Sequence, residues 1–173
     1  MDSIETGTGT GNIGAGDSGL WRVEELGSVF VDALLDVVAK VSGFSFGVMP
    51  SLSGEENDFD GMIGIMSFNS NKKDIMIFLS AEENDMRVIC SYMSGIAQEE
   101  VTKDDMYDAL CELVNMTAGT VKLRIGGEDY IFTLSVPFAV NGDNISIITK
   151  TRVNVFSRIL GTDEISVRLK IVY

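Results

Sequence analysis

The chain has 173 residues, of which 45% are hydrophobic and 23% are charged, as in an ordinary compact folded domain. Its formal net charge of −13 repels nucleic acid and anionic membrane surfaces, so we expect neither as a partner. It contains no histidine, which excludes Ser–His and Cys–His nucleophile pairs, histidine bases and histidine-ligated metals, so any chemistry must come from other side chains or from a partner.

The sequence shows no sign of membrane insertion or export. No apolar run approaches the roughly 18–20 residues of a membrane span, and the N-terminus lacks the basic and apolar regions of a signal peptide. We therefore expect a cytoplasmic protein. The two cysteines, Cys90 and Cys111, lie in predicted helices without a paired framework, so we expect free thiols.

Residues 1–20 are rich in Gly, Ser and Thr, which predicts a flexible tail followed by a single domain over residues 21–173. Gly9, Gly11 and Gly14 match the G-x-G-x-x-G pattern of dinucleotide-binding loops. That interpretation needs a strand before the glycines. The residues before Gly9 are too few and too polar to form one, so the tail is favoured.

The first half of the domain predicts a helix, three strands and a second helix. Apolar residues recur at helical spacing over residues 23–41, and Gly43 ends that helix. A strand "FSFGVMP" and an acidic loop "SGEENDFD" follow. The strands "GMIGIMSF" and "DIMIFLS", joined by "NSNKK", have the pattern of a hairpin. "AEENDMRVICSYMSGI" has the pattern of a helix.

The second half repeats the order of one helix followed by about three strands, so that the second helix of the first half lies between the two repeats. "TKDDMYDALCELVNMTAGTVKL" predicts a long helix, and Thr102 and Asp105 have the spacing of an N-cap motif. "DYIFTLSVPFAV" predicts a strand, and "NGDN" is the strongest short hairpin-turn signal in the chain. "ISIITK", "VNVFSRI" and "ISVRLKIVY" predict further strand, with "LGTDE" as a turn. The order favours an α+β fold: a duplicated αβββ unit whose largely antiparallel sheet carries two long helices on one face.

Two helical segments align without gaps: "DALLDVVAKVSG" (32–43) and "DALCELVNMTAG" (108–119). Duplication of one supersecondary unit would explain both this match and the strand order. Chance similarity between two amphipathic helices remains the alternative, because apolar spacing alone produces some matches. In this alignment Asp36 falls on Glu112, and Ala39 falls on Asn115.

The second helix carries a polar pair on its outward face. At about 100° per residue, one stripe should be core: Met106, Leu110, Leu113, Thr117 and Val121. Asp108, Glu112, Asn115 and Gly119 fall on the opposite side, with Glu112 and Asn115 one turn apart. A glycine inside a helix costs about 1 kcal/mol relative to alanine. Gly119 is therefore consistent with a partner approaching beside Asn115, although helix termination is the simpler explanation.

Each of these features also has an ordinary structural interpretation. Glu-x-x-Asn is a weak motif, and a solvated polar face is common on helices. Cys111 could contact a partner or be a half-buried structural thiol. Asp108 could lie at the rim of an interface or simply solubilise the helix. The methionines follow the predicted strands and helices, which indicates core packing, and "GEENDFD" lacks the ligand pattern of a calcium loop.

The segment "ELVNMTAGTVK" resembles the signature helix of the CheC/CheX/FliY family of bacterial chemotaxis phosphatases. In that family E-x-x-N is followed by a small residue, Gly and often Lys, which here are Glu112, Asn115, Ala118, Gly119 and Lys122. The resemblance covers about residues 24–173 and includes "SGF", "DGMIGI" and "LSVP…NGDN". CheC-like members carry two such helices and CheX-like members one. The residues aligned with the pair in the first helix make this chain CheX-like.

The resemblance implies a phosphatase that acts on the phospho-aspartate of a CheY-type receiver domain. Asn115 would orient the attacking water and Glu112 would pair with the receiver's lysine, with Asp108, Cys111 and Gly119 contacting the partner. The protein would need no cofactor of its own, since the receiver holds Mg2+, and it would form a homodimer. The alternative is a non-catalytic adaptor that binds a receiver or a flagellar-switch component. A receiver from outside chemotaxis is equally compatible.

Overall fold

The computed structural model describes residues 22–50, 58–71, 73–125, 131–146 and 153–173. The predicted tail at residues 1–20 and most of the predicted acidic loop lie outside these ranges. The helices are α1 (Val23–Ser42), α2 (Glu83–Ser94), the short 3-10 helix η1 (Gln98–Glu100) and α3 (Lys103–Ile125). The strands are β1 (Gly47–Val48), β2 (Asp58–Asn69), β3 (Ile75–Ala81), β4 (Thr133–Leu134), β5 (Phe138–Ser146), β6 (Val155–Gly161) and β7 (Ser166–Val172).

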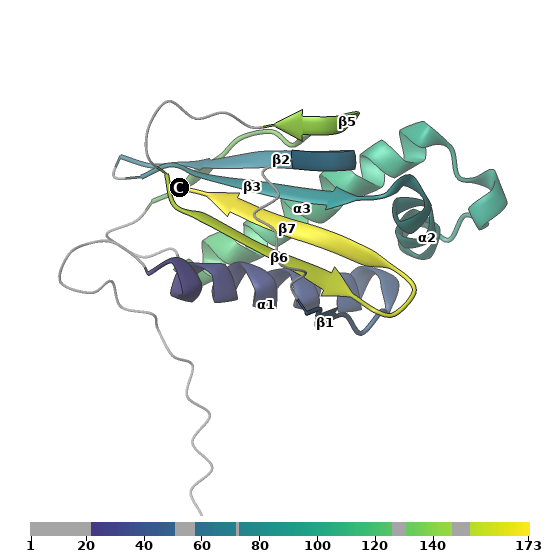
Figure 1. Ribbon diagram of the computed structural model, residues 1–173, viewed down its shortest axis with the longest axis horizontal. Helices are drawn as coiled ribbons and strands as arrows, with labels where there is room; N and C mark the ends of the chain where they lie inside the picture. Colours follow the sequence, from purple (N-terminus) through teal and green to yellow (C-terminus); the bar gives the residue numbers. More distant parts are fainter. Residues whose placement is uncertain (1–21, 51–57, 72, 126–130, 147–152) are drawn as a thin grey trace, which may run out of the picture.

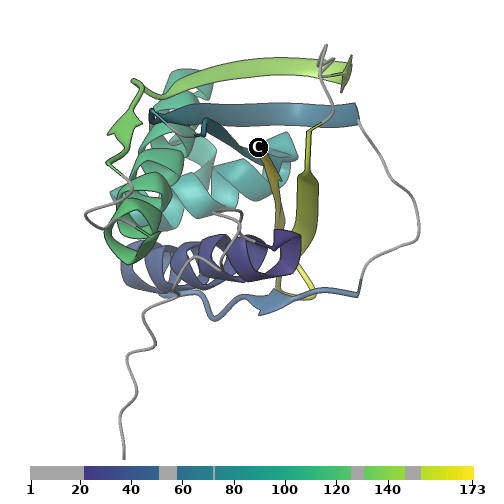
Figure 2. The same ribbon diagram turned by 90° about the vertical axis from the view of Figure 1, so that its left-hand side faces the viewer.

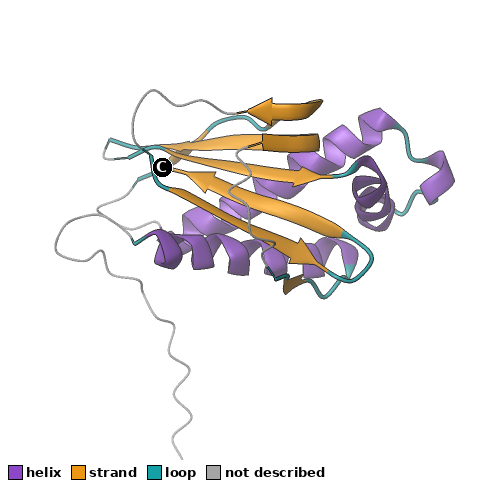
Figure 3. Cartoon of the chain, viewed as in Figure 1, coloured by secondary structure: helices purple, strands orange, loops and turns teal. Residues whose placement is uncertain are grey.

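The molecule has two layers, a curved antiparallel sheet and helices on one of its faces (Figures 1 and 2). The sheet order is β1-β6-β7-β3-β2-β4, and β5 pairs with β2 next to β4. Alternate side chains of β3, namely Ile75, Ile77 and Leu79, are fully buried under the helices, as the period of a strand requires. The predicted α+β class and antiparallel sheet are therefore confirmed (Figure 3).

The strand order supports the duplicated unit. In each half a helix is followed by an edge element and then by a two-stranded hairpin, and β3 pairs with β7 at the centre. If β1 changes places with the β4/β5 edge, β2 with β6, and β3 with β7, the same strand order results when the sheet is read from its other edge. Chance similarity of two amphipathic helices would not produce this pseudo-two-fold arrangement of the strands.

The prediction of a hairpin turn at "NGDN" is wrong. Asn141 to Asn144 lie inside β5, which pairs along β2. The register shifts between Phe59 and Gly61, so that β5 carries one extra residue, as in a β-bulge. Gly61 has a φ of 81°, and a Cβ there would lie 2.7 Å from the Ala81 carbonyl oxygen, so the bulge requires glycine. Pairing with β2 therefore overrides the local turn signal.

Two predicted strands are shorter than expected. Only Gly47–Val48 of "FSFGVMP" is strand. "DYIFTLSVPFAV" is interrupted between β4 and β5 at Pro137, which has no backbone N–H for a sheet ladder. The segment between β4 and β5 remains hydrogen-bonded to β2, because the Ser135 N–H donates to the Ser67 carbonyl at 2.9 Å.

Candidate functional site

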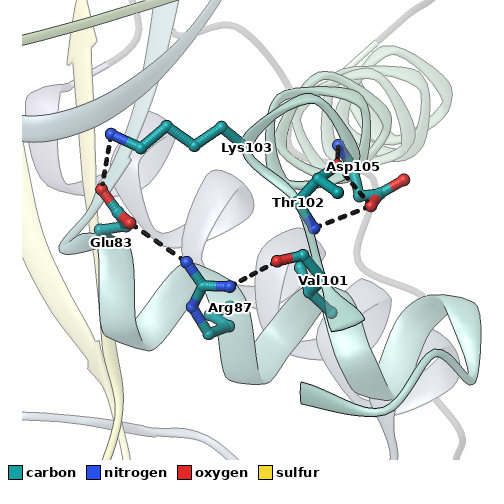
Figure 4. A network of polar contacts seen from close by, with 6 residues as sticks. All are labelled: Glu83, Arg87, Val101, Thr102, Lys103 and Asp105. Carbon is teal, nitrogen blue, oxygen red and sulfur yellow. Dashed lines mark hydrogen bonds and ion pairs between the residues drawn. The ribbon is translucent and has the colours of Figure 1, made fainter. Parts of the chain in front are cut away.

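The N-terminus of α3 is fixed by the predicted capping motif (Figure 4). The Asp105 N–H donates to Thr102 Oγ1 at 3.2 Å, and the Thr102 N–H donates to Asp105 Oδ2 at 2.9 Å. These reciprocal bonds satisfy backbone donors that the helix leaves unpaired. The hydrogen bond from the Thr102 hydroxyl, followed by the one from its backbone, lowers the pKa of Asp105. The helix that carries Glu112 and Asn115 therefore begins at a defined residue.

Helix α2 supports the same end of α3. Arg87 donates a hydrogen bond to the Val101 carbonyl and forms an ion pair with Glu83 at 3.1 Å (Figure 4). Glu83 also pairs with Lys103 at 3.1 Å. The Lys103 hydrogen bond is the main reason that the pKa of Glu83 is lowered. Exposed ion pairs contribute little individually, but this network joins two helices and the segment between them.

The inner face of α3 packs against the sheet as the sequence predicts. Seven residues of this face are buried: Met106, Leu110, Leu113, Val114, Thr117, Ala118 and Val121. The approach to β2 is close, because a Cβ on Gly64 would lie 2.9 Å from Leu110 Cγ. A close-packed interior resists displacement, so this contact sets how the opposite face of α3 is presented.

The outward face of α3 presents the predicted polar pair to solvent. Glu112 is exposed and Asn115 is partly exposed, on adjacent turns. The Asn115 amide donates to Glu112 Oε2 at 3.5 Å, the outer limit of a hydrogen bond. Among the described residues, no group donates a hydrogen bond to the side-chain oxygen Oδ1 of Asn115. The amide is therefore accessible and only weakly engaged, and the predicted solvent exposure of both side chains is confirmed.

Gly119 does not terminate the helix, so the simpler explanation of this glycine is wrong. α3 continues to Ile125, whereas the aligned Gly43 ends α1 with a φ of 76° and donates its N–H to the Ala39 carbonyl. A Cβ placed on Gly119 would meet nothing within 4 Å. The glycine therefore leaves open surface one turn beyond Asn115.

Two other predicted partner contacts, Asp108 and Cys111, flank the polar pair. Asp108 is exposed and Cys111 is partly buried. Burial, with a smaller effect of Asp108, raises the pKa of the Cys111 thiol. A raised pKa keeps the sulfur protonated, so Cys111 is suited to contact and not to nucleophilic attack.

In the first repeat, the residue aligned with Glu112 forms an ion pair. Asp36 pairs with Arg124, which lies in the last turn of α3. The pairing of Arg124 with Asp36 is not predicted from the sequence. No local signal could have revealed it, because 88 positions separate the two residues. With alanine at position 39, this face of α1 has no amide beside the carboxylate that is aligned with Glu112, and that carboxylate is paired with Arg124.

The polar pair lies on an outward helix face, where Glu112 is exposed and Asn115 is partly exposed. A depression of about 650 Å3 lies elsewhere, between α2 and the turn that joins β6 to β7, and no residue of α3 lines it. Over the described ranges, no group of three or more Asp, Glu or Cys side chains is placed to hold a metal ion. Within the same part of the chain, no helix combines the length and apolarity needed to cross a membrane.

This fold occurs in solved structures of CheC-like and CheX proteins. A CheC-like superfamily protein from Shewanella sp. PV-4 is 19% identical with a TM-score of 0.73, and the match covers 86% of this chain and 96% of that one. CheX from Vibrio vulnificus is 16% identical with a TM-score of 0.73, over 85% and 97% of the two chains. A CheX–CheY–BeF3–Mg2+ complex from Borrelia burgdorferi matches with 17% identity and a TM-score of 0.68, over 87% and 99%.

These structures define the class as the CheC-like fold of chemotaxis proteins. The family described as chemotaxis phosphatase CheX matches residues 62–159, which is more than half of the chain and includes Glu112 and Asn115. The chain therefore belongs to the CheX family of chemotaxis phosphatases. A search of curated proteins gave no significant match.

Proposed function

We propose that this protein hydrolyses the phospho-aspartate of a CheY-type receiver domain, with Asn115 and Glu112 as its catalytic residues. The observation that carries the proposal is the accessible Glu112–Asn115 pair on α3, beside the open surface at Gly119. The similar fold of a CheX in complex with CheY, BeF3 and Mg2+ supports the class of partner. Beryllofluoride has the shape and charge of a phosphoryl group, so that complex holds an activated receiver.

An open helix face suits this reaction because the receiver provides most of the active site. Phosphoryl transfer needs in-line geometry and charge stabilisation more than covalent chemistry from the protein. In our proposal the receiver holds Mg2+ and supplies a lysine, so this chain needs no cofactor of its own. The phosphatase inserts two side chains into a site that already exists, which accounts for an enzyme without histidine.

Asn115 would position the attacking water. Its amide oxygen can accept a hydrogen bond from the water while the NH2 group donates to a phosphoryl oxygen. The water oxygen attacks phosphorus as the bond between phosphorus and the aspartyl oxygen breaks, giving inorganic phosphate and a free carboxylate. With a pKa near 3.9, the leaving carboxylate needs no proton at neutral pH, so the water's protons remain with phosphate and solvent. An aspartate at this position would instead repel the phosphoryl group.

Glu112 would set the register between the two proteins. Within the described part of the chain, its carboxylate accepts one long hydrogen bond, from Asn115 at 3.5 Å. Exchanging that long bond for one to the receiver's lysine is favourable, since the ammonium group adds the attraction of an opposite charge that the neutral amide lacks. The exchange would also release the Asn115 NH2 group toward the phosphoryl oxygens. A receiver substrate implies that the protein works in the cytoplasm.

We also propose that the protein forms a homodimer through the sheet edge that β4 and β5 provide. Exposed sheet edges are usually covered or paired. Three large apolar side chains of this edge region are exposed: Ile131 at 77%, Val136 at 79% and Phe138 at 50%. Light scattering of wild type and of Val136→Lys tests this, since a dimer at this edge should be weakened by the lysine. A monomeric wild type would contradict it.

The test of activity is the decay of phosphorylated CheY-type receivers with Mg2+ present, with and without this protein. Wild type should accelerate phosphate release, and Asn115→Ala should lower that acceleration by two or more powers of ten while retaining binding, because lost positioning acts on the rate. Glu112→Ala should weaken both binding and rate. Clear binding without any acceleration would make the protein an adaptor that reads the phosphorylated state.

A further inference from the structure

Leu123 is the most exposed large apolar side chain among the described residues, at 87%. Isolated exposed leucines are common and need no explanation by themselves. The position of this one is informative, because it lies on the same helix as the catalytic pair. Leu123 is 11 residues after Glu112, which at about 100° per residue places it only about 20° from Glu112 around the helix. Glu112, Gly119 and Leu123 therefore form one stripe.

The distance along the helix places Leu123 inside any interface centred on Asn115. Eight residues separate the two, which corresponds to a rise of about 12 Å. A stable interface buries about 800 Å2 on each partner, equivalent to a disc of roughly 16 Å radius. Gly119 lies between them and adds no side chain, and a Cβ there would meet nothing within 4 Å, so the helix surface is open at this position.

The turn that carries Leu123 is held in place on both sides. Val121 is fully buried and Ile125 packs against the main core. Arg124 connects the same turn to α1 through its ion pair with Asp36. A side chain on a fixed turn loses little backbone entropy on binding, which is how a preorganised anchor contributes affinity.

We propose that Leu123 is a specificity-determining anchor for the receiver domain, and this inference rests on the proposed function. The structure assigns it a binding role separate from the chemistry, since it lies too far from Asn115 to touch the reacting atoms. A matching receiver should present an apolar surface about 12 Å from its phosphorylated aspartate, as measured along α3. Receivers with a charged surface at that place should bind poorly.

Binding is measured by calorimetry with receiver domains activated with beryllofluoride and Mg2+, and turnover is measured as phosphate release from the phosphorylated receiver. Leu123→Gln keeps helix propensity and removes the apolar surface. It should weaken binding about tenfold to a hundredfold, the expected effect of losing one buried leucine, and leave kcat at saturating receiver unchanged. Leu123→Met should bind within about threefold of wild type, because the two side chains are similar in volume and polarity.

Val155→Thr is the matched control. Val155 is also exposed, at 43%, but it lies opposite Val172 in register and so on the sheet face away from the helices. It should not change the affinity. Equal affinities for wild type and Leu123→Gln, with Asn115→Ala inactive, would overturn the anchor and leave the proposed function standing. Binding by wild type without any acceleration of phosphate release, together with weak binding by Leu123→Gln, would overturn the function and keep the anchor. No binding by wild type would refute both.

Discussion

Replacing Gly119 should make the protein more stable and less active at the same time. The helix continues through Gly119, and a Cβ there meets nothing within 4 Å, so alanine adds no clash. Gly→Ala in a helix interior contributes about 1 kcal/mol. For a chain of this length, that raises Tm by about 2–4 °C. Gly119→Gln should also be stabilising, since glutamine is a good helix former.

The same substitutions should impair docking, because they fill the open surface beside Asn115. We expect Gly119→Gln to reduce kcat/KM for a phosphorylated receiver at least tenfold, and Gly119→Ala to have a smaller effect. The assays are thermal denaturation followed by circular dichroism, and receiver dephosphorylation. A fall in Tm would show that the site is less open than the structure indicates. Unchanged kcat/KM for Gly119→Gln would show that no partner approaches this surface.

Gly43 is the natural control, since it occupies the aligned position of the first repeat. Its surroundings are equally open, but its φ of 76° lies in the left-handed region, which costs other residues about 1–2 kcal/mol. Gly43→Ala should therefore lower Tm and leave dephosphorylation of the receiver unchanged. Substitution by alanine should then raise Tm at Gly119 and lower it at Gly43.

Three further predictions test the proposed chemistry and the support of α3. Asn115→Asp should be as inactive as Asn115→Ala toward a phosphorylated receiver, because a carboxylate repels the phosphoryl group; activity near wild type would exclude water positioning by the amide. Thr102→Ala should lower the free energy of unfolding by about 1 kcal/mol in urea titrations. The pKa of Asp105 is lowered in the folded state, so its carboxylate stabilises the fold fully above the unfolded pKa near 3.8. This stabilisation is lost as the pH falls through the folded pKa. The difference in unfolding free energy between wild type and Asp105→Asn should therefore shrink below about pH 4. Gly64→Ala should destabilise the fold by about 1–3 kcal/mol through overpacking against Leu110, and wild-type stability would show that α3 can shift without cost.

The sequence predicts the local features of α3 well because each depends on residues close in the chain. The spacing of Leu110, Leu113 and Val121 defines the buried face, and the cap at Thr102 depends on a residue three positions away. The outward position of Glu112 and Asn115 follows from the same helical period. These predictions hold because helix geometry relates neighbours along one element.

Features that depend on distant pairing could not be predicted in this way. The "NGDN" segment has the composition of a turn, but its place in β5 is determined by β2. A glycine such as Gly119 is typical of a helix end, but the helix continues to Ile125, and Val121 in the following turn is buried in the core. Tertiary contacts override local propensity in both cases.

The asymmetry between the two repeats follows from where each helix ends. α1 stops at Ser42 and is capped by Gly43, whereas α3 continues past the aligned Gly119 for more than one further turn. That extra turn carries Arg124, which forms an ion pair with Asp36 on α1, the residue aligned with Glu112. It also carries Leu123 on the open face. The extension of α3 thus engages the carboxylate of the first repeat and enlarges the surface around Asn115 in the second. The lengths of the two helices therefore account for an accessible glutamate–asparagine pair on α3 and an ion-paired carboxylate at the aligned position of α1.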